Sequence, residues 1–150
     1  MVEIVHGDIT KIPADVIINA ANTENVHGGG VDLAIAHAAG NEYKYACDES
    51  NGQPIGEFLV SPAGKLDAKK IIDIPTINLI TGQVITYKEL ETVWNKVLDY
   101  CIKKGYKTVA TPLLGTGVVG LDGAKVQQIL SDVAKDKSEV EVKIVIYAPS

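Results

Sequence analysis

The sequence contains no arginine: all 14 of its basic residues are lysines, and the formal net charge is −5 at pH 7. Proteins that bind nucleic acids usually carry basic clusters with arginine, whose guanidinium group pairs bidentately with phosphates and guanine bases. We therefore expect neither DNA nor RNA to be a main partner. The same absence predicts that backbone N–H groups do much of the work of holding any bound phosphate.

Cysteine is also scarce. The two cysteines, Cys47 and Cys101, form no C-x-x-C motif and have no histidine at metal-ligand spacing, so we expect no metal site. A chain of 150 residues can bury enough surface to fold without disulfides or a metal. Two free thiols are typical of a reducing compartment, and this pattern predicts the cytoplasm.

Long apolar runs are absent as well. The longest, such as Val16 to Ile18, fall far below the roughly 18 residues of a membrane span, so we expect no membrane partner. The first residues lack the basic start and apolar stretch of a signal peptide, and we expect none. The length, with 46% hydrophobic and 22% charged residues, predicts one globular domain over residues 1–150, which we expect to be a monomer.

What is present is an alternation of short apolar runs and amphipathic stretches. We expect strands at residues 2–5, 15–19, 57–61, 70–74, 107–112 and 140–147. We expect helices from Val31 to a stop at Gly40, at 87–104 and at 122–134, with a helix or turn at 41–50 and a polar loop at 20–27. Strands that alternate with helices predict an α/β domain whose largely parallel sheet lies between helical layers.

Two strand–loop–helix units are rich in glycine. The first passes through Gly28-Gly29-Gly30 into the helix from Val31, and the second passes through residues 115–120 into the helix from Asp122. Glycine lets backbone N–H groups turn toward a ligand, and a helix N-terminus adds roughly half a positive charge. Two such loops at the carboxyl ends of parallel strands can clasp one diphosphate. The alternative is that these glycines only make tight turns.

The second loop, with Gly115, Gly117 and Gly120, also fits the G-x-G-x-x-G dinucleotide fingerprint. That fingerprint normally lies in the first βα turn of a nicotinamide-binding domain, whereas this match lies late in the chain. A dinucleotide-binding enzyme is therefore an alternative reading. No G-x-x-x-x-G-K-[ST] motif is present, which excludes a P-loop.

Several motifs taken together carry a resemblance. In chain order they are Gly7-Asp8-Ile9-Thr10, Asn19-Ala20-Ala21-Asn22, His27 to Asp32, Ala38-Ala39-Gly40 and Gly115 to Gly120. This combination resembles the macro domain, an ADP-ribose-binding module, from Val2 to Tyr147. The resemblance implies a three-layer α/β/α sandwich with a mixed, mostly parallel sheet of about six strands. It also implies that the ligand lies across the two glycine loops, and it implies no cofactor.

The resemblance assigns a set of ligand-binding residues. Asp8 resembles the acid that accepts a hydrogen bond from the adenine amino group, Tyr147 the aromatic that stacks on adenine, and Asn22 the amide that holds the distal ribose. The plainer alternatives are an Asx turn at Asp8, a core role for Tyr147, and a loop asparagine that bonds its own backbone. The full set is Asp8, Ile9, Ala21, Asn22, Gly28, Gly29, Gly30, Val31, Asp32, Gly115, Thr116, Gly117, Val118, Val119 and Tyr147.

For catalysis the resemblance points to Asn22 and Asp32. Asp32 lies in the first turn of its helix, where in hydrolytic macro domains an aspartate contacts the distal ribose or a catalytic water; the alternative is an acid that only stabilises the helix terminus. We interpret the chain as an ADP-ribose-binding domain that hydrolyses ADP-ribosyl esters of acidic side chains, or O-acetyl-ADP-ribose. Its partners are then ADP-ribose or an ADP-ribosylated protein, and a non-catalytic reader is the alternative.

The chain also departs from the family pattern at three positions. Ala36 stands where many hydrolytic relatives carry a histidine, and Val119 replaces the usual aromatic of the second loop. Asp73 stands where many relatives have a strand histidine. His27 resembles the histidine of relatives that act on ADP-ribose 1″-phosphate, and the sequence gives it no base role.

Overall fold

The computed structural model describes residues 1–148. A 3₁₀ turn at Ile9–Lys11 follows the first strand. The strands are β1 (Val2–Gly7), β2 (Val16–Asn22), β3 (Leu59–Pro62), β4 (Lys70–Ile77), β5 (Thr108–Thr111) and β6 (Glu141–Tyr147). The helices are α1 (Gly30–Ala39), α2 (Asn41–Ser50), α3 (Tyr87–Lys104) and α4 (Gly123–Lys135).

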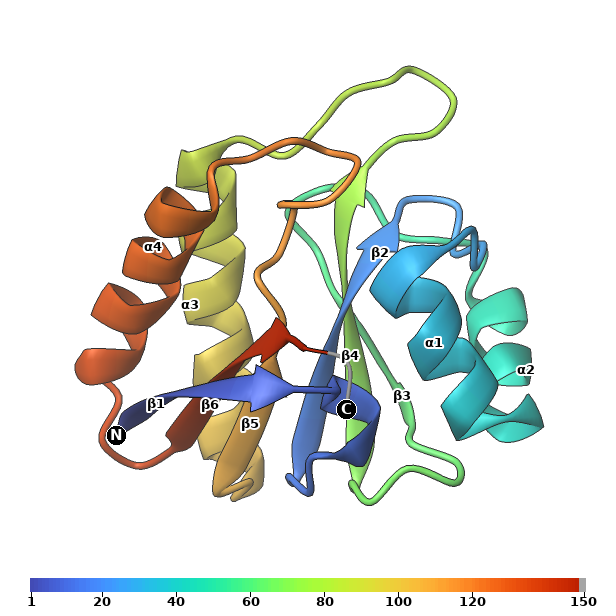
Figure 1. The fold of residues 1–150 in the computed structure, drawn as a ribbon. Helices are drawn as coiled ribbons and strands as arrows, with labels where there is room; N and C mark the ends of the chain where they lie inside the picture. The colour runs from blue at the N-terminus through green and yellow to red at the C-terminus, as the bar shows by residue number, and fades with distance from the viewer. Residues whose placement is uncertain (149–150) are drawn as a thin grey trace.

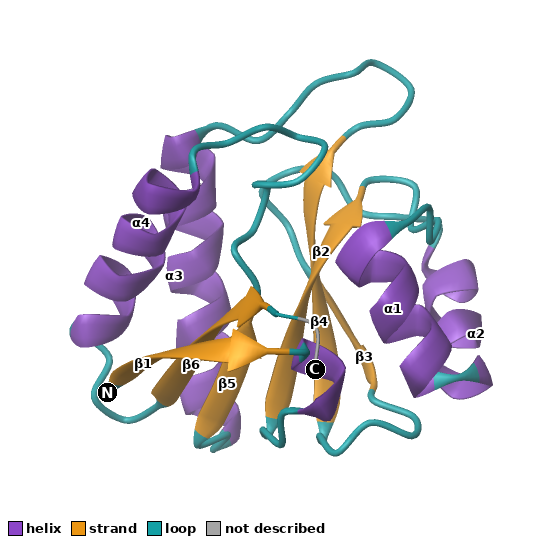
Figure 2. Ribbon diagram, viewed as in Figure 1, coloured by secondary structure: helices purple, strands orange, loops and turns teal. Residues whose placement is uncertain are grey.

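The six strands form one sheet in the order β1-β6-β5-β2-β4-β3. Every neighbouring pair is parallel except β3 with β4, so the edge strand β3 alone is antiparallel. Figures 1 and 2 show α3 and α4 side by side on one face of the sheet and α1 and α2 on the other. The expected three-layer α/β/α sandwich with a mostly parallel, mixed sheet is confirmed.

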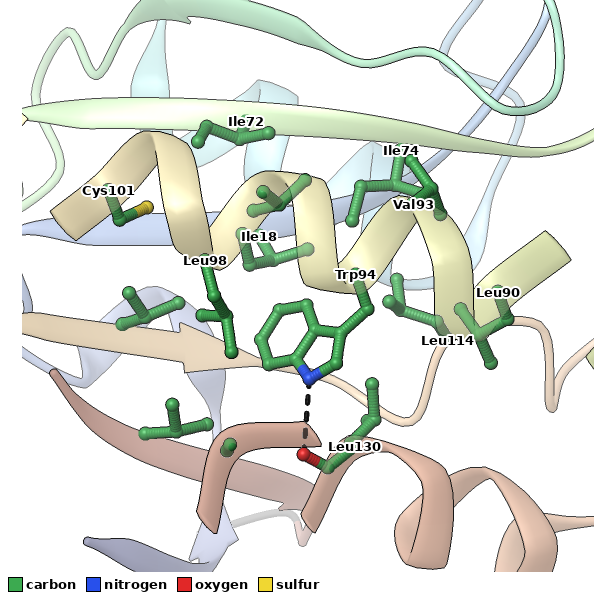
Figure 3. Close-up of a cluster of buried hydrophobic side chains, with 14 of the residues drawn as sticks. Ile18, Ile72, Ile74, Leu90, Val93, Trp94, Leu98, Cys101, Leu114 and Leu130 are labelled. Carbon is green, nitrogen blue, oxygen red and sulfur yellow. Dashed lines mark hydrogen bonds between the residues drawn. The ribbon is translucent and has the colours of Figure 1, made fainter. Parts of the chain in front are cut away.

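Each face of the sheet has its own apolar core, because successive residues of a buried strand point to opposite faces. Val16 and Ile18 of β2 belong to the cluster beneath α3 and α4, whereas Ile17 belongs to the cluster beneath α1 and α2. Trp94 lies at the centre of the larger cluster, and its indole nitrogen donates a hydrogen bond of 3.1 Å to the Leu130 carbonyl of α4 (Figure 3). That bond satisfies the one polar atom of a side chain that is otherwise fully buried.

Helix α3 has the bounds that its sequence predicts. Thr86 and Glu89 form a capping box at its start, and the left-handed residue Gly105 (φ 80°) ends it. Residues 41–50, expected as a helix or turn, are the helix α2.

The main correction to the expected elements concerns β2. Residues 20–22, expected to begin a polar loop, continue the strand as far as Asn22 and pair with β4, which itself runs on through Pro75 to Ile77. Pro75 has no N–H to donate to the ladder, and the register between the two strands shifts between Ala21 and Asn22, next to it. The extension carries Asn22 to the carboxyl edge of the sheet.

Strands β2 and β5 are parallel neighbours, and their chains continue into helices on opposite faces: α1 after β2 and α4 after β5. This is the arrangement that opens a crevice at the carboxyl ends of parallel strands. Both glycine loops lie at that edge. Among the helices of residues 1–148, none is long and apolar enough to span a bilayer.

Candidate functional site

A cavity of about 650 Å³ opens at the carboxyl edge of the sheet. Four segments that are distant in sequence build it: the end of β1, the start of α1, the residues after β5, and the end of β6. The lining residues are Gly7, Asp8, Ile9, Gly30, Val31, Ala34, Pro112, Leu113, Thr116, Val145, Ile146 and Tyr147. Six of these were expected as ligand-binding residues: Asp8, Ile9, Gly30, Val31, Thr116 and Tyr147.

The other expected residues do not line this cavity. They are Ala21, Asn22, Gly28, Gly29, Asp32, Gly115, Gly117, Val118 and Val119. Six lining residues were not among the expected ligand-binding residues, although Gly7 belongs to the first motif: Gly7, Ala34, Pro112, Leu113, Val145 and Ile146. Most are apolar residues of strand ends and loops, which look like ordinary core until the topology brings the four segments together.

The first glycine loop delivers an open helix N-terminus to the cavity. Gly29 precedes α1 and supplies no side-chain cap, while Gly30 takes a left-handed φ of 58° that favours glycine. Within the described residues, the N–H groups of Gly30 and Val31 make no hydrogen bond, and both residues line the cavity. Unpaired N–H groups and the helix dipole together favour an anion here.

The second glycine loop differs from this expectation. Helix α4 begins only at Gly123, and the Asp122 side chain already caps it by accepting a 3.0 Å hydrogen bond from Ala124 N. The N-terminus of α4 is therefore capped by a side chain of the protein itself, because an ordinary capping residue precedes it. This loop therefore offers a ligand its own backbone instead of a free helix N-terminus. A hydrogen bond of 2.8 Å from Leu121 N to Gly115 O closes this loop, and Val118 within it is fully exposed.

At the adenine end expected from the resemblance, Asp8 makes an Asx-type turn. Its Oδ1 accepts hydrogen bonds from the backbone N–H of Thr10 at 2.9 Å and from the Thr10 hydroxyl at 2.7 Å. The side-chain bond from Thr10, followed by the backbone bond, lowers the pKa of the Asp8 carboxyl below its usual value. Asp8 also lines the cavity, and its Oδ2 makes no hydrogen bond among residues 1–148. The turn therefore uses one carboxylate oxygen and leaves the other without a partner in the described chain.

Tyr147 lies beside Asp8, because it is the register partner of Gly7 across β1 and β6. Its side chain lines the cavity and the residue is 68% exposed, so Tyr147 is not a core aromatic. An exposed ring at a cavity mouth offers a stacking surface for a planar group.

Asp32 is held by two donors on one oxygen. Its Oδ1 contacts Asn19 Nδ2 at 2.8 Å and His27 Nδ1 at 3.0 Å, and its side chain is only 11% exposed. Its other oxygen, Oδ2, makes no hydrogen bond within the described part of the chain. The carboxylate is thus fixed through one oxygen, while the other has no partner in the described chain.

Asn22 closes the loop between β2 and α1. Its Nδ2 donates to Val26 O at 2.6 Å and its Oδ1 accepts from Val26 N at 3.1 Å, which is the loop-closing role considered as an alternative to ribose binding. An amide carries a second hydrogen and a second lone pair, so this role leaves room for a ligand hydroxyl. The residue is 7% exposed.

A buried polar cluster beneath Asp32 was not expected from the sequence. Asp73 of β4 is 1% exposed, and it accepts hydrogen bonds from the Tyr43 hydroxyl at 2.6 Å and from Asn19 Nδ2 at 3.0 Å. Burial raises the pKa of the Asp73 carboxyl against the opposing effect of these hydrogen bonds. The available signal was a polar residue in the middle of each of two mostly apolar buried strands, Asn19 in β2 and Asp73 in β4, since such residues need partners.

Of the positions that depart from the family pattern, Ala36 is fully buried, and the histidine that follows it in α1, His37, is exposed. No group of three or more histidine, cysteine, aspartate or glutamate side chains among residues 1–148 is arranged to hold a metal ion.

Comparison with known proteins places this architecture in a family. The family profile described as "Macro domain" matches residues 18–130. A relative from Enterobacter cloacae subsp. cloacae named O-acetyl-ADP-ribose deacetylase is 37% identical over 135 residues, which cover 87% of this chain and 75% of the relative. A relative from Lactiplantibacillus plantarum named as a macro domain-containing protein is 38% identical over 117 residues, covering 78% of this chain and 68% of that protein.

Solved structures agree with the sequence matches. The macrodomain of Oceanobacillus iheyensis with MES bound superposes with a TM-score of 0.87 at 30% identity, covering 98% of this chain and 84% of that one. A variant of that macrodomain, solved with ADPR, gives a TM-score of 0.87 at 29% identity and covers 98% of this chain and 85% of that one. The chain belongs to the macro domain family.

Proposed function

We propose that this macro domain binds ADP-ribose and hydrolyses ADP-ribosyl esters. The observation that carries the proposal is the order of groups along the site. An acceptor and an exposed aromatic ring lie at one end, an uncapped helix N-terminus follows, and Asp32 stands in the first turn of that same helix. Relatives named O-acetyl-ADP-ribose deacetylase, at 35–37% identity, support the hydrolytic half of the proposal.

Adenine lies, on this proposal, between Asp8 and Tyr147. The free Oδ2 of Asp8 accepts a hydrogen bond from the exocyclic amino group, because an ionised carboxylate is an acceptor only. The Ile9 backbone lies beside it, and the exposed Tyr147 ring stacks on the purine.

The diphosphate lies across the two glycine loops. The free N–H groups at the start of α1 face it from one side, and the backbone of residues 115–119 faces it from the other. Because no arginine is available, these neutral donors supply most of the contacts. We expect affinity in the micromolar range, roughly −7 to −8 kcal/mol.

The distal ribose then reaches Asn22 and Asp32. Where the ester oxygen is on the anomeric carbon, a water molecule held by Asp32 Oδ2 attacks that carbon, its oxygen forms the new C–O bond, and the bond to the acyl oxygen breaks. The carboxylate departs with the bonding electron pair, and the water proton passes to a phosphate oxygen of the ligand. Asp32 orients the water and need not store a proton, so a carboxylate fixed through Oδ1 suits the role.

A non-catalytic reader of ADP-ribosylation is the second candidate. The observation that favours it is Ala36, which is fully buried where many hydrolytic relatives carry a histidine. A modified protein as the partner, a monomeric state and a cytoplasmic location stay predictions from the sequence.

Two experiments test the proposal. Calorimetric titration with ADP-ribose, NAD and AMP measures ligand choice, and we expect ADP-ribose to bind most tightly. A lack of ADP-ribose binding at millimolar ligand contradicts the whole proposal, and a preference for NAD favours a dinucleotide-binding enzyme instead.

The second experiment is single-turnover release of ADP-ribose from a glutamate-modified protein. We expect Asp32→Ala to slow release by about 10²-fold or more while affinity stays within about tenfold. Asn22→Ala should lower both, because it orients the ribose. Asp132→Ala, an exposed aspartate on α4 away from the cavity, is the control. No release by the wild type above the no-enzyme level leaves the reader function, and an Asp32→Ala variant as fast as wild type contradicts the role of Asp32.

A further inference from the structure

Beneath Asp32 lies a polar cluster that the proposed chemistry does not use. Asn19 of β2 and Asp73 of β4 are register partners in adjacent parallel strands, and Tyr43 and Cys47 of α2 pack over them. All four residues are at most 1% exposed. Most of the buried residues on this face are apolar, so a carboxyl group here carries a desolvation cost that an aliphatic side chain would not.

A single amide nitrogen joins the two carboxylates. Asn19 Nδ2 donates to Asp32 Oδ1 at 2.8 Å and to Asp73 Oδ1 at 3.0 Å, and it also lies 3.1 Å from the Tyr43 hydroxyl oxygen, so its two hydrogens serve three neighbouring acceptors. The Tyr43 hydroxyl donates to the same Asp73 oxygen at 2.6 Å. The Cys47 thiol lies 3.5 Å from Asp73 Oδ2. Asp73 is therefore fixed from three directions, and it fixes Asn19 in turn.

The orientation of the Asn19 amide matters for Asp32. If the amide were flipped, its oxygen would face carboxylate oxygens of both aspartates, which repel it. Both carboxylates therefore favour the orientation that donates to Asp32, and Asp73 strengthens this preference by adding a second acceptor. Asn19 Oδ1 is buried without a hydrogen-bond partner among residues 1–148, so the nitrogen side alone sets this orientation.

We propose that Asp73 and Tyr43 are positioning residues for Asp32. Through Asn19 they hold Asp32 Oδ1, and so they aim Oδ2 at the water. The catalytic part of this inference rests on the proposed function. Neither residue touches the substrate, so their effect falls on the rate of the chemical step and not on ADP-ribose affinity.

The test compares two substitutions of Asp73. Asp73→Leu removes the acceptor but fills the space, and we expect it to slow single-turnover ester hydrolysis about tenfold or more, with the Kd for ADP-ribose within about threefold. Asp73→Asn keeps an acceptor oxygen for Tyr43 and Asn19, and we expect a rate within about threefold of wild type. Tyr43→Phe keeps the ring and removes one donor, so it should give an intermediate loss even if Asp73→Leu does not fold.

A double-mutant cycle separates positioning from general packing. In an Asp32→Ala background, Asp73→Leu should cause no further loss of rate, because it acts through Asp32. Ser61→Ala is the matched control, since Ser61 is also buried in this sheet but its hydroxyl makes no hydrogen bond in the described chain. Additive losses with Asp32→Ala, or equal losses in Asp73→Leu and Asp73→Asn, overturn the inference.

Crystal structures of the two Asp73 variants decide the inference independently of activity. We expect the contact from Asn19 Nδ2 to Asp32 Oδ1 to be kept in Asp73→Asn and lost in Asp73→Leu. If it persists in both, Asp73 does not position Asp32. If the wild type releases no ADP-ribose while the contact is lost as expected, the hydrolytic function fails and the positioning relationship stands.

Discussion

The Oδ1 atom of Asp8 accepts hydrogen bonds from both the backbone N–H and the hydroxyl of Thr10, while its Oδ2 has no partner in residues 1–148. Asp8 itself lines the cavity. A short polar turn after β1 thus fixes a carboxylate at the position expected for adenine recognition. The hydrogen bonds that hold it also keep it ionised, so it can only accept.

The first prediction concerns this carboxylate. Asp8→Ala should weaken ADP-ribose binding by about 1.5–3 kcal/mol, the value of a hydrogen bond to a charged group. The preference for adenine over hypoxanthine should shrink with it, because the amino group loses its acceptor. Calorimetry with ADP-ribose and its inosine analogue measures both effects. If Asp8→Ala binds the two ligands as the wild type does, Asp8 only caps the turn.

The second prediction concerns two glycines of the same loop. Gly115 has a φ of 75°, and a Cβ there would lie 2.8 Å from Leu121 Cδ1, so Gly115→Ala should destabilise the fold by about 1–3 kcal/mol. Gly117 has open space around it, so Gly117→Ala should change stability by less than about 0.5 kcal/mol. Urea unfolding of the pair measures this, and equal losses would show that crowding at Gly115 is not the cause.

The sequence predicted the fold well because its signals were local. The capping box at Thr86, the glycine at position 105 and the apolar stripe between them define α3 without help from the rest of the chain. Strand β2 was predicted too short because its last residues, Ala20 to Asn22, have no strand preference of their own. Pairing with β4 keeps them extended, and pairing is a tertiary interaction.

The site was predictable only where a motif carried it. Asp8, Gly30 and Tyr147 belong to recognisable patterns, and the structure brings all three to one cavity. The partners of Asp32 were not predictable, because the Asn19–Asp73 contact depends on the register of two strands that are 54 positions apart. The capped N-terminus of α4, by contrast, had a signal in the sequence, because Asp122 is an ordinary capping residue and Gly29 is not.

The third prediction concerns the two thiols. Cys47 and Cys101 are at most 1% exposed and belong to the apolar clusters on opposite faces of the sheet, so they cannot pair within one molecule. Burial raises the pKa of each to about 12, and Asp73 adds to the effect at Cys47. Near pH 8 a disulfide reagent should react with both at least about 10³-fold more slowly in the native protein than in denaturant. A fast-reacting thiol in the native protein contradicts the burial described here.

The last prediction concerns Asp15, at the end of β2 opposite the site. Its Oδ2 accepts a 2.6 Å hydrogen bond from Lys107 N, and Lys69 Nζ lies 3.6 Å from its Oδ1, so the carboxylate ties the starts of β2 and β5 together. The pKa of Asp15 is lowered below 3.8 in the folded protein, mainly because its carboxylate accepts the hydrogen bond from the Lys107 backbone. Because the folded state favours the ionised form, this stabilisation is fully present above the unfolded pKa. It is lost as the pH falls through the folded pKa.

Asp15→Asn keeps an acceptor for Lys107 but removes the charge, so near pH 7 it should lower the free energy of unfolding by about 1 kcal/mol. The difference from wild type should shrink as the pH falls below 3.8, since the wild-type carboxyl then becomes neutral as well. Urea unfolding over a series of pH values measures it, with Glu139→Gln, an exposed carboxylate, as the control. A difference that stays constant down to the lowest pH at which the protein folds would mean that the charge of Asp15 contributes nothing. ADP-ribose affinity should be unchanged throughout, because Asp15 lies at the far edge of the sheet from the cavity.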